Sequence, residues 1–184
     1  MHEDLLSALG EGCGLILVAG PTGQGKTTAI EAALADPRCP SNVSFFGDIH
    51  GEVQDAFRAV QLAGSQVAVA VLRIPRATGA FARLTDMGVP ARDLVDVVRT
   101  VFTTRLLHPA QSMPVLLHER LRVTNALREL VLVDPSEDAV HRQALADGMR
   151  SLRQAGLEYV RAVRAAYPLR GCPPHTLSGV ELPG

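Results

Sequence analysis

Short apolar runs alternate with helical patterns along the first half of the chain. Three runs are short and rich in apolar residues, as expected of strands in a sheet, and they occupy residues 15–18, 42–46 and 67–72. Between them, residues 28–35 and 52–63 carry apolar positions at helical spacing. Strands that alternate with helices indicate βαβ units. The pattern therefore predicts an α/β fold with a parallel sheet of at least three strands.

The second half of the chain is predicted to be mostly helical. The pattern places helices over residues 77–87, 90–108, 121–131, 136–147 and 148–166. One further strand is predicted at Pro114–Leu117, and Thr124 suits an N-cap. We divide the chain into a core at 1–108, a helical C-terminal subdomain at 109–166, and a tail at 167–184. The tail is rich in proline and glycine, so we expect it to be loosely ordered.

A glycine-rich stretch adds a candidate chemistry to this pattern. It fits G-x-x-x-x-G-K-[ST], the motif of a phosphate-binding loop, and it lies between a predicted strand and a predicted helix, as that motif requires. Glycines let backbone N–H groups close around phosphate oxygens, and the start of the helix adds unpaired donors. The residues expected to bind a nucleotide are Gly20, Pro21, Thr22, Gly23, Gln24, Gly25, Lys26, Thr27 and Thr28.

Two side chains of this loop have predicted roles. Lys26 is expected to reach the β- and γ-phosphates of ATP, and the Thr27 hydroxyl is expected to bind Mg²⁺. Among 18 basic residues, Lys26 is the only lysine, which favours a role that needs a compact ammonium group. The alternative is a chance match in a glycine-rich turn, with a strand and a helix beside it by coincidence.

Acidic residues follow the predicted strand at 42–46. A P-loop fold needs a carboxylate at the end of the next core strand, to hold Mg²⁺ or to polarise the attacking water. Asp48 is the first candidate for this catalytic and metal-binding role, and Glu52 is the second. Asp is also a good N-cap, so Asp48 would equally suit the start of the next helix.

Two arginines, Arg73 and Arg76, follow the predicted strand at 67–72. In open α/β sheets the carboxyl ends of the strands face the ligand, so either guanidinium group could meet the γ-phosphate. The alternative is that both are ordinary solvated arginines of a loop.

Composition narrows the class of protein. The 184 residues are 47% hydrophobic, which is enough for a substantial core in a single domain of ordinary size. The net charge of −1 gives no basic field that would favour nucleic acid. No apolar run approaches the ~20 residues of a membrane span, and the acidic start is unlike a signal peptide. Three widely spaced cysteines fit a reducing compartment, so we expect a cytoplasmic protein.

Several segments resemble the ATPases of type II secretion and type IV pilus assembly. Gly20–Thr28 is similar to the Walker A motif of that family, and Gly47–His50 falls on its Gly-Glu-Ile-Arg motif. Gly79–Val89 is very similar to its Gly-Ala-x-x-Arg-Leu-x-Asp-Met-Gly-Val segment, and Gly148–Arg153 matches its C-terminal helical region. The resemblance covers roughly residues 14–164.

The resemblance implies a RecA-like P-loop core that binds ATP and Mg²⁺. It also implies a hexameric homo-oligomer on the cytoplasmic face of the inner membrane, where ATP hydrolysis moves a platform protein. A full-length secretion ATPase is an alternative partner. The chain would then be peripheral to the membrane, through its partners.

The sequence also departs from the family pattern. Asp48 replaces the Walker B glutamate, and Arg73 replaces the histidine of the His box. The acidic Asp box, the four-cysteine zinc module and the N-terminal domain have no counterpart in these residues. Three functions stay open. They are slow ATP hydrolysis, nucleotide binding by a catalytically silent regulatory or structural paralogue, and a small-molecule P-loop kinase.

Overall fold

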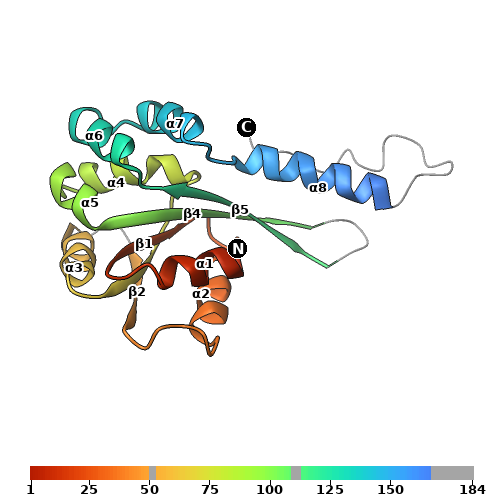
Figure 1. Cartoon of the computed structure of the whole chain (residues 1–184), viewed down its shortest axis with the longest axis horizontal. Coiled ribbons are helices and arrows are strands. Elements are labelled where there is room, and N and C mark those ends of the chain that lie inside the picture. Colours follow the sequence, from red (N-terminus) through yellow and green to blue (C-terminus); the bar gives the residue numbers. More distant parts are fainter. Residues whose placement is uncertain (50–52, 109–112, 167–184) are drawn as a thin grey trace.

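The computed structural model describes residues 1–49, 53–108 and 113–166, and a five-stranded sheet forms its centre (Figure 1). The strand order is β2-β3-β1-β4-β5, with the first four strands parallel and the last antiparallel. The strands are β1 (Gly14–Ala19), β2 (Val43–Ile49), β3 (Val67–Leu72), β4 (Val98–Leu107) and β5 (Val115–Arg122). The predicted α/β fold with at least three parallel strands is confirmed.

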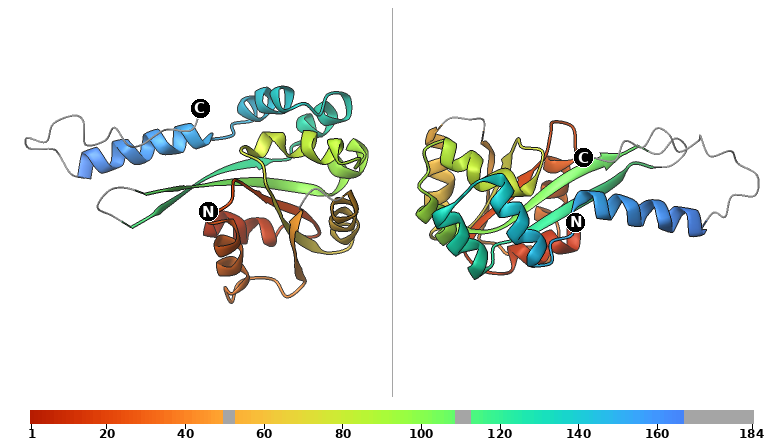
Figure 2. Two further views of the ribbon diagram at one scale, coloured as in Figure 1. Left: turned by 180° about the vertical axis from the view of Figure 1, so that it is seen from behind. Right: turned by 90° about the horizontal axis from the view of Figure 1, so that it is seen from above.

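Helices cover both faces of the sheet (Figures 1 and 2). One face packs against α1 (His2–Leu9) and α2 (Lys26–Leu34), with Ile16 and Val18 of β1 pointing into that layer. Leu15 and Leu17 of the same strand point the other way, because successive side chains of a strand alternate between faces. The elements of this second layer are α3 (Val53–Ala63), η1 (Ala77–Gly79), α4 (Ala80–Asp86), α5 (Ala91–Val97), α6 (Asn125–Val133) and α7 (Glu137–Ala146).

The prediction of one helix over residues 90–108 is wrong in its second half. Helix α5 ends at Val97, and β4 follows immediately. Strand β4 is rich in β-branched residues, which lose side-chain freedom in a helix and pack well on a pleated sheet. It lies between β1 and β5, so its threonines are buried, and Thr100 donates to the Leu121 carbonyl at 2.9 Å.

Helix boundaries in the C-terminal part differ from the prediction in a similar way. Residues 121–122 belong to β5, so α6 begins only at Asn125, where Thr124 is the predicted N-cap and accepts from the Leu127 amide. Ser136 caps α7 through the Ala139 amide. The last helix, α8 (Leu152–Ala166), begins four residues later than predicted.

Strands β4 and β5 form a long hairpin that extends beyond the helical layers, with α8 beside it (Figures 1 and 2). Leu117 of β5 packs against Leu152 and Ala155 of α8. Since β5 pairs with β4, the sheet continues past the proposed boundary at residue 108, and the division into core and subdomain stays a prediction. The tail at 167–184 lies outside the described residues. Within the described ranges, no helix is both long and apolar enough to cross a membrane.

Glu119 ties β5 to the two neighbouring helical segments. The residue is 4% exposed, and its Oε1 atom accepts from the amide of Ala77 at 3.3 Å, where η1 begins. Its Oε2 atom accepts from the amide of Leu152 at 3.2 Å, where α8 begins. Amides at the starts of helices lack intrahelical partners, so a buried carboxylate between two such starts satisfies both.

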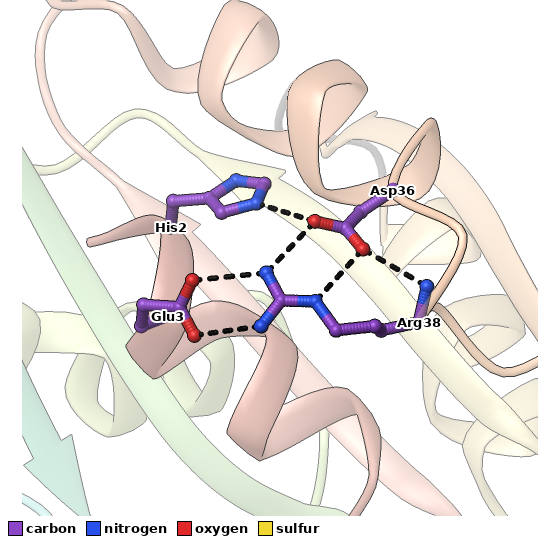
Figure 3. Close-up of polar contacts among 4 residues, drawn as sticks. All are labelled: His2, Glu3, Asp36 and Arg38. Carbon is purple, nitrogen blue, oxygen red and sulfur yellow. Dashed lines mark hydrogen bonds and ion pairs between the residues drawn. The ribbon is translucent and has the colours of Figure 1, made fainter.

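A network of charged side chains joins α1 to the segment after α2 (Figure 3). Arg38 donates to both carboxylate oxygens of Glu3, at 3.1 and 2.9 Å, and to both oxygens of Asp36. The Nε2 atom of His2 lies 2.9 Å from Asp36. The guanidinium group of Arg38 holds the pKa of Asp36 well below its ordinary value, with His2 adding to that shift.

Candidate phosphate-binding site

The glycine-rich loop lies between β1 and α2, as predicted. Strand β1 ends at Ala19 and α2 begins at Lys26. Gly20 has φ of 142°, and a Cβ there would lie 2.9 Å from the carbonyl oxygen of Thr104. Gly25 precedes α2 in the left-handed conformation, with φ of 75°. The loop therefore requires glycine at both of these positions for steric reasons.

Lys26 is the buried charge of this loop. It is 7% exposed, and its Nζ atom donates to the carbonyl of Pro21 at 2.6 Å. Burial lowers its pKa, the Asp48 carboxylate opposes that shift, and the Arg73 guanidinium adds to it. Asp48 and Arg73 both act on the ammonium group of Lys26, so these three predicted site residues lie in the same region.

The pairing of β2 with β3 brings Asp48 and Arg73 together. Asp48 is in register with Val71, and Ile49 with Leu72, so Arg73 follows β3 beside the end of β2. Both Nε and Nη2 of Arg73 lie 2.8 Å from Oδ2 of Asp48. Asp48 therefore lies within a strand as an ion-pair partner of Arg73, which disfavours the alternative that it caps a helix.

The remaining predicted site residues differ in position. Thr27 and Thr28 are exposed on the first turn of α2. Glu52 lies outside the described residues. Arg76 lies near α7, where its Nη1 atom is 4.0 Å from Oε1 of Glu137. In the described part of the chain, no three His, Cys, Asp or Glu side chains converge as a metal-binding group.

The β4–β5 hairpin forms a wall of the candidate site, which sequence reasoning missed. Oε1 of Gln24 accepts from the amide of Leu106 at 2.7 Å, and a Cβ on Gly25 would lie 3.1 Å from Leu116. These contacts link the glycine-rich loop to the hairpin beside which α8 lies. The run of threonine and valine residues in β4 is the sequence signal for this strand, but the prediction places a helix there.

Three solved structures are similar to this chain in fold. The pilus retraction motor PilT with bound ADP superposes with a TM-score of 0.62 at 18% identity, over 83% of this chain. The ATPase DotB of Legionella pneumophila gives 0.71 at 14% identity over 87% of the chain. DotB of Yersinia pseudotuberculosis gives 0.63 at 14% identity over 94%. No protein-family model matches the sequence, and neither does any curated protein.

These similarities show the fold of the chain. The predicted resemblance to secretion and pilus ATPases is confirmed at that level, with a mixed α/β core that the three solved ATPases share. The chain spans 63% of the length of PilT and 59% and 58% of the two DotB proteins. At this identity, fold similarity leaves the chemistry to be argued from the residues of the site.

Proposed function

We propose that the chain is an ATPase of the secretion and pilus-assembly type, which binds Mg-ATP at Gly20–Thr28 and hydrolyses it slowly. The observation that carries this proposal is the buried ammonium group of Lys26, held in a glycine-rich loop at the end of the central strand. A buried lysine whose pKa is lowered by burial, in a loop beside other charged residues, is a candidate for a functional site.

Different groups of the loop would bind different parts of a triphosphate. Backbone amides of the loop and of the first turn of α2 would donate to phosphate oxygens, where the helix dipole favours negative charge. Lys26 would exchange its bond to the Pro21 carbonyl, at 2.6 Å, for the phosphates. An ammonium group gains more from a phosphate oxygen than from a neutral carbonyl.

The donor set suits Mg²⁺. The Thr27 hydroxyl and the Asp48 carboxylate supply hard oxygen ligands, which this ion prefers. When bound, the ion would neutralise charge on the phosphate oxygens. Asp48 would first have to exchange its two contacts with Arg73, at 2.8 Å each, for that role.

The ion pair of Asp48 and Arg73 is the reason to expect slow turnover. The Asp48 carboxylate would have to break its contacts with Arg73, at 2.8 Å each, before it could orient water or bind Mg²⁺. Asp48 is also one methylene shorter than glutamate, and a misplacement of about 1 Å can reduce the rate by about 10²-fold. Arg73 could still donate to a terminal phosphate once it is released from Asp48.

A homo-oligomer, with a hexameric ring as the expected form, is the assembly that we propose. A full-length secretion ATPase is the alternative partner, and an inner-membrane platform protein is the proposed target of the motor. Placement in the cytoplasm, peripheral to the inner membrane, follows from these partners.

Steady-state phosphate release from ATP tests the proposal. We expect release by the wild-type chain that falls about 10²-fold in Lys26→Ala, because a charge-assisted contact to the phosphates is lost. Arg58→Gln, which removes an exposed arginine from α3, is a matched control and should keep the wild-type rate. Equal rates in the wild type and Lys26→Ala would refute the proposal.

The Asp48–Arg73 ion pair also favours a second candidate, a nucleotide-binding paralogue without catalysis. In that case ATP binds, but the carboxylate stays paired and no phosphate is released. Calorimetry with ATP separates the two functions, because tight binding without turnover supports the silent paralogue. Sustained turnover that depends on Lys26 would exclude it.

A further inference from the structure

A cavity of about 230 Å³ lies between the sheet and the C-terminal helices, and no residue of Gly20–Thr28 lines it. The residues that line it come from β4, β5, the segment after β3, α7 and the start of α8. Figure 1 shows where these elements lie in the fold. The side chains that matter here are Arg76, Arg105, Glu119, His141 and Arg153. The cavity is smaller than the pockets that take drug-sized molecules, so it suits a compact group.

Positive charge predominates in the lining. Three guanidinium groups face one carboxylate, that of Glu119. Both oxygens of Glu119 accept backbone amides, from Ala77 and Leu152. Glu137 approaches Arg76 from outside the lining at 4.0 Å, so the excess of positive charge rests on Arg105 and Arg153. An anion is therefore the kind of ligand that the lining attracts.

Two buried polar atoms of these residues lack partners. Within the described ranges, Nε of Arg105 and Nδ1 of His141 are buried and have no hydrogen-bond partner. Buried polar atoms are almost always hydrogen-bonded, because leaving one unpaired is costly, so each exception needs an explanation. A bound group with acceptor oxygens would supply the partner that Arg105 lacks.

We propose that this cavity binds a small oxyanion of the phosphate class, either free inorganic phosphate or the phosphate group of a nucleoside monophosphate. Arginine is suited to this ligand because its planar fork matches the oxygens of phosphate. The amide of Leu152 is already bonded to Glu119, so we assign Arg105, Arg153 and His141 as the donors to this ligand. The proposal does not depend on ATP hydrolysis, because none of its residues belongs to the phosphate-binding loop.

Titration calorimetry on the full chain tests the proposal. The background is Lys26→Ala, which should weaken binding at the loop, and inorganic phosphate and AMP are titrated separately at constant ionic strength. We expect saturable binding of at least one of them at a single site. Arg105→Gln added to this background should raise the dissociation constant at least tenfold, while Arg58→Gln should leave it unchanged.

The two ligands distinguish the sources of the phosphate group. Binding of inorganic phosphate that Arg105→Gln weakens supports a free anion, and binding of AMP alone supports a nucleotide. Circular dichroism checks that each variant is folded, and Arg153→Gln, which alters an exposed residue, replaces Arg105→Gln if that variant unfolds. No saturable binding in the Lys26→Ala background, or binding that neither arginine substitution weakens, overturns the proposal.

Discussion

Helix α2 has a cluster of charged side chains at each end, and the two clusters are built differently. Beyond its C-terminal end, Asp36 and Arg38 pair with each other and with His2 and Glu3 of α1 (Figure 3). At its N-terminal end, Lys26 is buried in the loop, and burial lowers its pKa. In the first cluster each carboxylate has a side-chain partner within the cluster, and the second holds an ammonium group away from water.

The difference between the two ends is the one that we expect between a cluster that stabilises the fold and a cluster that serves the proposed site. Exposed ion pairs gain modest stability and leave every partner satisfied, which fits a contact that fixes one helix against another. A buried ammonium group is destabilising unless its surroundings compensate, so its retention needs a reason other than stability.

The largest expected effect is on catalysis at the N-terminal end. Asp48→Asn should lower the rate of ATP turnover by about 10²-fold or more, because a general base contributes on that scale. The dissociation constant of ATP should change only a few-fold. Phosphate release at saturating ATP measures the effect. Asp36→Asn is the matched control. An equal loss of turnover in both variants would show that the charged clusters at the two ends of α2 do not differ in their role in catalysis.

The next effect is on acid stability at the C-terminal end. The pKa of Asp36 lies below its ordinary value when the chain is folded, so the unfolded chain binds more protons as the pH falls. The stability that Asp36 provides is present above its ordinary pKa and is lost as the pH falls through and below it. Below about pH 5, the slope of unfolding free energy against pH reports how many more protons the unfolded chain binds than the folded chain. Asp36→Asn should lower that number by up to about one.

Urea unfolding at a series of acidic pH values measures that slope. Arg58→Gln on α3 provides the comparison and should keep the wild-type slope, because arginine stays charged throughout the acid range. Identical slopes in the wild type and Asp36→Asn would show that the network at this end does not stabilise the fold.

The smallest expected effect is a gain in stability. Lys26→Met removes a buried ammonium group whose pKa is lowered by burial, so the folded chain should become more stable by about 0.5–1 kcal/mol. Thermal unfolding without nucleotide measures the change, with Arg38→Met expected to be destabilising. A loss of stability in Lys26→Met would indicate that the ammonium group serves the fold.

Local signals in the sequence predicted the elements around the glycine-rich loop. The loop requires glycine for steric reasons, as Gly20 and Gly25 show, so its motif is visible without tertiary information. The caps at Thr124 and Ser136 depend on residues three positions away, and both were identifiable for that reason. Helices cover both faces of β1 and β3, so nearly every residue of these strands is apolar. Such apolar runs predict buried strands without tertiary information.

Features that depend on distant pairings were not predictable. Strand β4 was interpreted as a helix, because its buried threonines are polar and only its place between two strands explains them. The pairing of Asp48 with Arg73 depends on the register of β2 against β3. The contact of Gln24 with Leu106 joins residues 82 positions apart, and no local pattern encodes it.

The two bonds of Glu119 have a practical consequence for anyone who shortens or fuses this chain. A version that stops after α7 would remove the Leu152 amide and leave a carboxylate oxygen buried without that donor. Such an orphaned group costs about 1–3 kcal/mol, in addition to the packing lost with α8. The last helix therefore belongs with the sheet in any trimmed version, and a fusion partner is better attached beyond it.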